Sequence, residues 1–143
     1  GLPMMRVFVD TSALFALLSS NDINHESAWG IWEGLLRDET PLVCSNYIVV
    51  EAAALVQRRI GMEALRAFRE CVCPMMDVEW VDRATHDSAE TALLTANRRS
   101  LSLVDCTSFI VMRRLGIARA FAFDVHFAEQ DFVCLPEMRL HDR

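Results

Sequence analysis

Lysine is absent from this sequence of 143 residues, and all 14 of its basic residues are arginine. A phosphate-binding P-loop requires a lysine beside the phosphates that it holds. Covalent catalysis through a Schiff base requires a lysine amine as well. The composition therefore excludes P-loop nucleotide hydrolysis and lysine-dependent covalent chemistry.

The sequence also lacks apolar runs long enough to cross a membrane. The early run at residues 13–18 is too short to span a bilayer, and no signal peptide pattern is present. We therefore expect a cytoplasmic protein with no membrane partner. Residues 1–4 look like a cloning remnant, and residues 5–143 are expected to form a single domain around one core.

The cysteines lack the spacing of a disulfide or zinc framework. Their number is odd, and most of them lie in apolar stretches, so we expect free, buried thiols. The Cys71-Val72-Cys73 pair has no second pair to complete the four ligands of a zinc site. The five residues are Cys44, Cys71, Cys73, Cys106 and Cys134.

The net charge of −6 shows that the chain is not a generally basic nucleic-acid binder. This balance does not exclude phosphate chemistry, because carboxylates that bind divalent cations add negative charge where a phosphate must bind. The metal ion then supplies the positive field.

Short apolar segments alternate with helical patterns along the whole chain. This alternation predicts an α/β fold, in which a single-domain parallel sheet is flanked by helices. Gly61 and Gly116 are expected to end helices. Strands are expected at residues 6–9, 42–44, 75–81, 120–123 and 132–135, and helices at residues 12–18, 24–37, 46–60, 63–72, 82–99 and 105–115.

Acidic residues follow two of the expected strands. Asp10 comes directly after Val-Phe-Val, and Asp124 comes directly after Ala-Phe-Ala-Phe. Ligands of open α/β sheets bind outside the carboxyl ends of the strands. The two aspartates are therefore expected at the same, functional edge of the sheet.

Two further carboxylates lie near helix starts. Asp105 opens an expected helix after Ser-Leu-Val, and Glu51 lies one turn into the helix that begins near Ser45. Glu51 is surrounded by valines and alanines, where an unpaired charge is costly to bury. We expect its side chain to face inward or towards the edge of the sheet.

Four converging carboxylates would repel one another and raise each other's pKa. A divalent cation relieves this repulsion, and carboxylate oxygens suit Mg²⁺ or Mn²⁺. Such ions polarise a phosphate and generate hydroxide for in-line attack. The sequence therefore predicts a metal site for phosphodiester chemistry.

Each acid also has a structural alternative. Asp10 and Asp105 are candidates for helix N-caps, Asp124 for a turn residue, and Glu51 for an ion pair with Arg58 or another arginine. A shared role in metal binding is favoured because three of the acids lie at equivalent topological ends of strands or helices.

Four segments together resemble the motifs of the PIN-domain family, in order and spacing. Residues 101–109, with the sequence LSLVDCTSF, are the most specific of them. The others are residues 7–14 (VFVDTSAL), Ser45 followed by Val-Glu-Ala at 50–52, and residues 122–127 (AFDVHF). The resemblance covers essentially the whole chain.

This resemblance implies a ribonuclease that uses Mg²⁺ or Mn²⁺. Small bacterial members are typically VapC toxins that a VapB-type antitoxin holds inactive, and they are often homodimers. For this chain the resemblance therefore implies an RNA substrate, a VapB-type antitoxin as a partner, and a homodimer. The implied catalytic and metal-binding residues are Asp10, Glu51, Asp105 and Asp124.

Other polar residues receive finer expectations. The Ser12 hydroxyl is expected to orient a phosphate or a metal-bound water, with Thr11 as the second candidate. Asp131 replaces the small residue that usually precedes the final Phe, and a surface role is expected for it rather than a fifth carboxylate at the rim. His126 is expected to pack or begin a helix, because hard cations prefer oxygen. His25, His86 and His141 have no partners at ligand spacing.

Arginine pairs and aromatic residues are open to two interpretations. The pairs at 58–59, 98–99 and 113–114 lie near expected helix ends, where they complement the helix dipole or contact phosphates beside the acidic site. Phe15, Trp29 and Trp32 are expected in the core. In a VapC-like fold, an exposed aromatic on the first two helices would instead indicate a partner surface.

Three rival functions remain to be weighed. A haloacid-dehalogenase-type enzyme needs a second Asp where Ser12 stands and also a lysine, and a response receiver needs a lysine as well. The stronger rival is a non-catalytic PIN-fold module that binds RNA or protein. Metal affinity separates it from an enzyme, since such a module need not bind Mn²⁺ at the carboxylates.

Overall fold

The computed structural model describes residues 5–138 and 140, and it contains five short strands, all parallel. The sheet has the order β3-β2-β1-β4-β5. The expectation about residues 1–4 lies outside the described residues. The strands are β1 (Val7–Val9), β2 (Leu42–Ser45), β3 (Asp77–Glu79), β4 (Arg119–Phe121) and β5 (Val133–Leu135).

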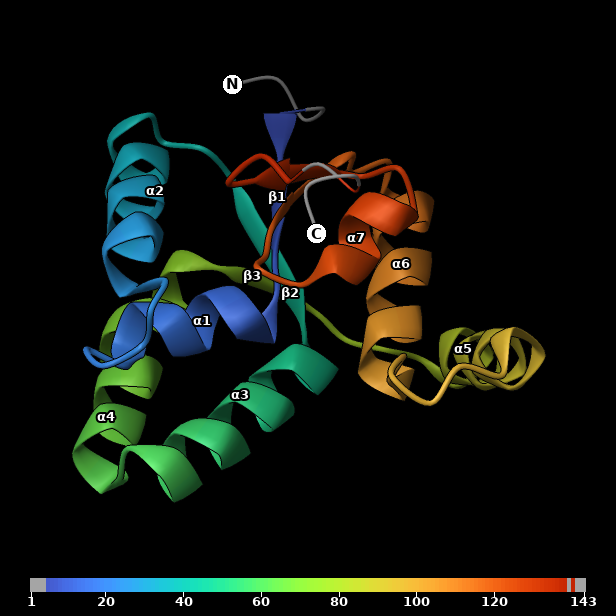
Figure 1. Cartoon of the computed structure of the whole chain (residues 1–143), viewed down its shortest axis with the longest axis horizontal. Coiled ribbons are helices and arrows are strands. Elements are labelled where there is room, and N and C mark those ends of the chain that lie inside the picture. The colour runs from blue at the N-terminus through green and yellow to red at the C-terminus, as the bar shows by residue number, and fades with distance from the viewer. Residues whose placement is uncertain (1–4, 139, 141–143) are drawn as a thin grey trace.

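Helices cover the sheet on both sides (Figure 1), as the alternating pattern predicts. Figure 1 shows α1, α2 and α4 on one side of the strands and α5, α6 and α7 on the other. The helices are α1 (Thr11–Leu18), α2 (His25–Arg37), α3 (Asn46–Arg59), α4 (Met62–Ala67), α5 (Arg83–Ala96), α6 (Leu103–Leu115) and α7 (Val125–Glu129). The predicted fold class is confirmed.

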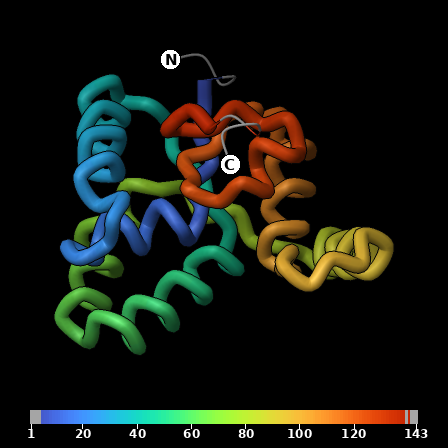
Figure 2. The backbone as a smooth tube through the Cα atoms, in the orientation of Figure 1, coloured from blue at the N-terminus to red at the C-terminus, as the bar shows by residue number. Residues whose placement is uncertain are grey.

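The core lies around β1, which runs between β2 and β4. In the backbone trace of Figure 2, the blue N-terminal strand lies beside segments that follow much later in the chain. Val7, Phe8 and Val9 are all fully buried. A strand that is apolar on both faces suits a sheet covered on both sides.

The edge strand β3 differs from β1, because all three of its residues are exposed. The adjoining α5 packs chiefly on α6 and projects from the body of the molecule in Figure 2. β3 is also shorter than the expected strand at 75–81.

Several helix bounds depart from the expectations for local reasons. The expected helix at 63–72 continues from α4 into a π-helical turn, η2 (Phe68–Val72), and a 3-10 turn, η3 (Cys73–Met75), which contains Pro74. α5 ends at Ala96 because Asn97 adopts a left-handed conformation with φ 51°. α6 begins at Leu103, two residues before the expected start at Asp105. Gly116 caps it at φ 71°, as predicted.

All five cysteines are free, as predicted, although Cys71 is exposed and Cys73 is half-buried. In the described part of the chain, no helix combines the length and apolar character needed to cross a membrane.

Candidate metal centre and active site

The four predicted carboxylates line one open cavity of about 460 Å³ at the carboxyl edge of the sheet. Asp10 follows β1, Glu51 lies on α3, Asp105 lies on α6 and Asp124 precedes α7. The complete lining is Asp10, Thr11, Ser12, Glu51, Ala54, Leu55, Arg58, Ser102, Asp105 and Asp124. The structure thus brings together every residue that the sequence assigned to the site.

Asp10 is the most deeply buried of the four, with 3% of its surface exposed. It caps α1, and its Oδ2 accepts hydrogen bonds from the Ser12 backbone N–H at 3.1 Å and from the Ser12 hydroxyl at 2.6 Å. Burial raises the pKa of Asp10 to about 7, and the charges of Asp105 and Asp124 add to the rise. The two bonds from Ser12 oppose this rise. The surroundings of Asp10 therefore disfavour its charged form.

Asp105 is held by a reciprocal capping box at the start of α6. Its backbone N–H donates to Ser102 Oγ at 3.0 Å, and its Oδ2 accepts from the Ser102 N–H at 3.1 Å. The alternative of Asp105 as the N-cap is wrong, because Ser102 is the cap and Asp105 is the third helical residue. Burial raises the pKa of Asp105, and the charge of Asp124 adds to this.

Asp124 caps α7, with its Oδ1 accepting the His126 backbone N–H at 2.9 Å. Sequence reasoning missed this helix, because five residues are too few to show a helical period. β4 ends at Phe121, so two residues separate the strand from Asp124. The aspartate still lies at the carboxyl edge, because it lines the cavity with Asp10.

Glu51 lies on a stripe of α3 that faces the cavity. Residues 51, 54, 55 and 58 all line it, which is the spacing of one helical face. The side chain is half-buried, in agreement with the expected orientation towards the edge. Among the described residues Glu51 forms no ion pair, although Arg58 borders the same cavity.

Ser12 connects two elements that are distant in sequence. Its hydroxyl donates to Asp10 and accepts a hydrogen bond from the Phe123 backbone N–H at 2.9 Å. Because its single proton points at Asp10, Ser12 holds that carboxylate and the segment before Asp124 in register. The Thr11 Oγ1, which is also buried, has no hydrogen-bond partner among the described residues.

A divalent metal ion fits the donor set of this cavity. The four side chains offer hard carboxylate oxygens. Burial and the charges of Asp105 and Asp124 raise the pKa of Asp10, and a bound cation would stabilise its ionised form. No three of them bring ligand atoms within 4.8 Å of one another, a test that covers the described residues. Mg²⁺ commonly keeps several waters and binds one or two carboxylates directly, which suits this wider spacing.

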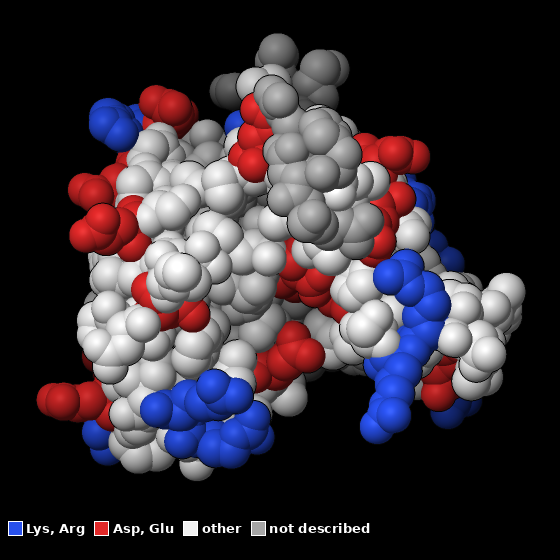
Figure 3. Space-filling model, in the orientation of Figure 1, with Lys and Arg blue, Asp and Glu red and all other residues white. Residues whose placement is uncertain are grey.

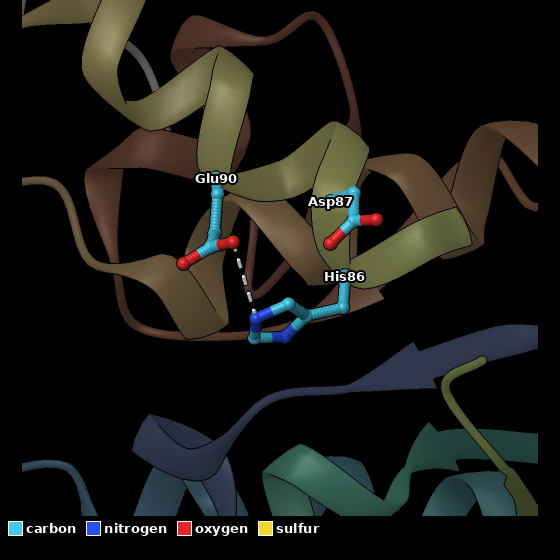
Figure 4. Close-up of side chains that lie close together, drawn as sticks. All are labelled: His86, Asp87 and Glu90. Atoms are coloured by element: carbon cyan, nitrogen blue, oxygen red, sulfur yellow. Dashed lines mark ion pairs between the residues drawn. The ribbon is translucent and has the colours of Figure 1, made fainter. Parts of the chain in front are cut away.

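A second group of ligand-type side chains lies on α5 (Figure 4). His86, Asp87 and Glu90 place one ligand atom each within 4.8 Å of the others. The expectation that His86 lacks partners at ligand spacing is therefore wrong. Its ring is already engaged, since Nδ1 lies 2.5 Å from the Tyr47 hydroxyl and Nε2 lies 3.4 Å from Glu90. In this arrangement the histidine links α5 to α3.

His126 occupies the packing role that was expected for it. The residue is buried in α7, with Nδ1 2.8 Å from Glu129 Oε1 and Nε2 3.2 Å from the Ser100 carbonyl oxygen. These contacts fasten the turn between α5 and α6 to α7.

Sequence reasoning missed the Ser102 cap, although a serine three residues before Asp105 is the signal of a capping box.

Asp131 lies away from the cavity. It is exposed, adopts a left-handed φ of 68°, and precedes β5, so it lies towards the amino ends of the strands. It does not line the acidic cavity. The structure agrees with the expected surface role of Asp131.

The PIN-domain family model matches residues 7–133. The chain belongs to the PIN-domain family. The predicted family is therefore confirmed, and the matched range contains the four segments that carry the cavity carboxylates. Which residues bind metal and catalyse remains a prediction.

Two curated relatives and two solved structures extend this finding. The relatives are named 23S rRNA-specific endonuclease VapC20 and come from two strains of Mycobacterium tuberculosis. Each is 37% identical over 131 residues, which covers 89% of this chain and 95% of the relative. The crystal structure of M. tuberculosis VapC20, described as a sarcin-ricin loop cleaving toxin, matches with a TM-score of 0.77 and 34% identity over 89% of this chain and 96% of that one.

The crystal structure of FitAcB from Neisseria gonorrhoeae has a TM-score of 0.65 at 12% identity, over 90% of this chain and 95% of that one. At this identity the likeness shows the fold alone. The prediction of a VapC-type ribonuclease agrees with the names of the M. tuberculosis relatives.

Proposed function

We propose that this protein is a metal-dependent endoribonuclease of the VapC type. The single observation that carries the proposal is the cavity in which Asp10, Glu51, Asp105 and Asp124 converge. Relatives that are 37% identical and named as rRNA endonucleases support the same reaction. We extend the proposal to ribosomal RNA as the first substrate to test.

In this proposal the four carboxylates hold Mg²⁺ or Mn²⁺. The bound ion supplies positive charge at the scissile phosphate and lowers the pKa of water. Ser12 contributes by fixing the direction of the Asp10 carboxylate, and Ser102 does the same for Asp105. Since the Ser12 proton is committed to Asp10, Ser12 acts in this proposal as a positioning residue.

Cleavage of ribosomal RNA by the purified protein tests this function. The wild type is assayed with Mn²⁺, with EDTA, and as the Asp105→Asn variant, whose amide oxygen retains the capping bond to Ser102. Cleavage that requires both the metal and Asp105 is the expected result, and primer extension then locates the cut. Equal activity in wild type and variant would contradict the assignment.

The non-catalytic PIN-fold module is the competing function. It predicts no cleavage by antitoxin-free protein, together with weak or absent Mn²⁺ binding. Isothermal titration with Mn²⁺ separates the two, because an enzyme of the proposed kind loses its metal affinity in Asp10→Asn.

A VapB-type antitoxin is proposed as the partner. Trp29 on α2 is 42% exposed and Ile23 before it is 95% exposed, whereas Trp32 lies in the core. The expectation that Trp29 lies in the core is therefore wrong, and the exposed aromatic supports a partner surface on the first two helices. Trp29→Asp is expected to abolish co-purification with the co-expressed antitoxin without lowering metal-dependent cleavage.

A homodimer through the β3 edge is also proposed. Val50 is 68% exposed, Trp80 is 75% exposed and Val78 is 38% exposed, beside an apolar cavity of about 660 Å³. A second copy would remove this surface from water. Light scattering is expected to give a dimer for the wild type and a monomer for Trp80→Asp, and an unchanged mass would reject this face.

A further inference from the structure

Arg58 borders the acidic cavity from the α3 side. It lies seven residues after Glu51 on the same helical face, about 10 Å further along the helix axis. Among the described residues it forms no ion pair with an acidic side chain. The guanidinium of Arg58 therefore lies beside the carboxylates and is available to contact a ligand.

Two further arginines lie outside the cavity lining, in the turn between α5 and α6. Arg98 and Arg99 are both exposed, and the turn leads directly to Ser102, which lines the cavity. Arg98 Nη2 lies 3.4 Å from Glu129 Oε1, and Glu129 also contacts His126. The ring of His126 in turn reaches the Ser100 carbonyl oxygen. The turn is thus pinned to α7, which begins at Asp124.

The surface charge has the same arrangement (Figure 3). Acidic side chains show within a hollow, and arginine surface lies on both sides of it. The chain carries a net charge of −6, so a polyanion needs local cations where it approaches. Arg113 and Arg114 differ, because Arg113 stacks on Phe132 and bonds Gln130, while Arg114 bonds Thr85.

We propose that Arg58 beside the cavity and Arg98 and Arg99 in the α5–α6 turn bind RNA backbone phosphates on either side of the cleaved one. The RNA strand then crosses the acidic cavity from α3 to the α5–α6 turn. This inference rests on the proposed ribonuclease function. RNA is favoured over an acidic protein segment because Arg58 shares its cavity with the four carboxylates of the proposed nuclease site, where a phosphodiester strand must bind.

Fluorescence anisotropy with labelled single-stranded oligouridylate tests the path. All proteins carry Asp105→Asn, so that binding is measured without cleavage. Arg58→Ala and Arg99→Ala are each expected to weaken binding by roughly tenfold and to reduce the salt slope by about 0.7. Arg58→Lys, which keeps the charge, is expected to restore most of the affinity. The control is Arg37→Ala at the end of α2, which leads into β2 at the opposite edge and is expected to bind like the parent.

A loosened turn must be distinguished from a lost phosphate contact. Glu129→Gln removes the pairing of Arg98 but keeps the arginine charge, so it is expected to retain RNA binding, whereas Arg98→Ala is expected to weaken it. In the cleaving background, Arg58→Ala is expected to raise KM with little change in kcat, because the contact is equally strong in ground and transition states.

Affinity of the Arg58 and Arg99 variants equal to that of Arg37→Ala would overturn the path. Unchanged RNA binding together with lost antitoxin binding would overturn it in favour of a protein partner. Failure of the wild type to cleave RNA with Mn²⁺ would reject the enzyme separately, since the anisotropy result does not depend on cleavage.

Discussion

The two walls of the acidic cavity hold their carboxylates by different means. Asp10, Asp105 and Asp124 lie at helix starts, where backbone N–H groups fix each side chain. Glu51 lies within α3 and projects from a helical face, with no such bond among the described residues. One wall is therefore rigid before any ligand binds, whereas the other depends on a longer side chain. The difference shows that a shared chemical role does not require shared structural support.

The largest expected effect is on catalysis, and it should be similar on both walls. Asp105→Asn and Glu51→Gln are each expected to lower RNA cleavage at least about a hundredfold, near 3 kcal/mol, because metal binding needs both charges. Initial rates at saturating Mn²⁺ measure this. If Glu51→Gln retained nearly full activity, only the rigid wall would bind the essential ion.

The second largest effect is a pH dependence of stability that arises from Asp10 on the rigid wall. The pKa of Asp10 is about 7, well above its unfolded value of 3.8, so the folded state binds an extra proton between these values. In the metal-free protein, the contribution of Asp10 to stability is therefore fully present below pH 4. It is lost as the pH rises through 7. In EDTA at pH 8, Asp10→Asn is expected to stabilise the protein by on the order of 2 kcal/mol.

Urea unfolding of wild type and Asp10→Asn at pH 5 and pH 8 gives the comparison. Saturating Mg²⁺ is expected to reduce or reverse the advantage of the variant, because the ion stabilises the ionised carboxylate. If the wild type were the more stable of the two at pH 8 in EDTA, the raised pKa of Asp10 would be contradicted.

A smaller effect distinguishes the two hydroxyls beside Asp10. Ser12→Ala is expected to cost about 1–3 kcal/mol, since it leaves the Phe123 N–H without its partner. Thr11→Val removes a hydroxyl that has no partner and is expected to be neutral or stabilising. Thermal melts of the two variants decide the point, and equal losses would show that Thr11 also has a structural bond.

The smallest expected effect compares how the cap of α6 and the Glu51 side chain contribute to stability. Ser102→Ala removes the cap of α6 and is expected to cost about 1 kcal/mol. Glu51→Ala lies on a half-exposed helical face and is expected to change stability by less than about 0.5 kcal/mol. Chemical denaturation measures both, and a larger loss for Glu51→Ala would reveal a structural partner for it.

The sequence predicted the parts of the site that depend on local pattern. Val-Phe-Val before Asp10 is recognisable because a buried strand is continuously apolar, and the residue after it must lie at the sheet edge. Glu51 stood out because charge is rare within an apolar helix. The start of α6 was misplaced by two residues, because the Ser102 cap was overlooked.

Contacts across the fold were beyond this reasoning. The bond between Ser12 and Phe123 joins residues 111 positions apart, and it gives Ser12 a structural contact that the sequence did not indicate. The link from Tyr47 to His86 joins α3 to α5 in the same way. Neither pair has a periodic signal in sequence, because each depends on how helices pack around the sheet.

The sequence by itself determined the alternation of strands and helices and the positions of the acids after strands, since apolar period and strand ends are local properties. The family followed from the resemblance of its four motifs. Only the tertiary structure decided that Arg58 shares a cavity with Glu51, that Asp131 lies away from it, and that burial raises the pKa of Asp10. The physical reason is that solvent exclusion and charge proximity are properties of packed neighbours, which parallel strands bring together from distant parts of the chain.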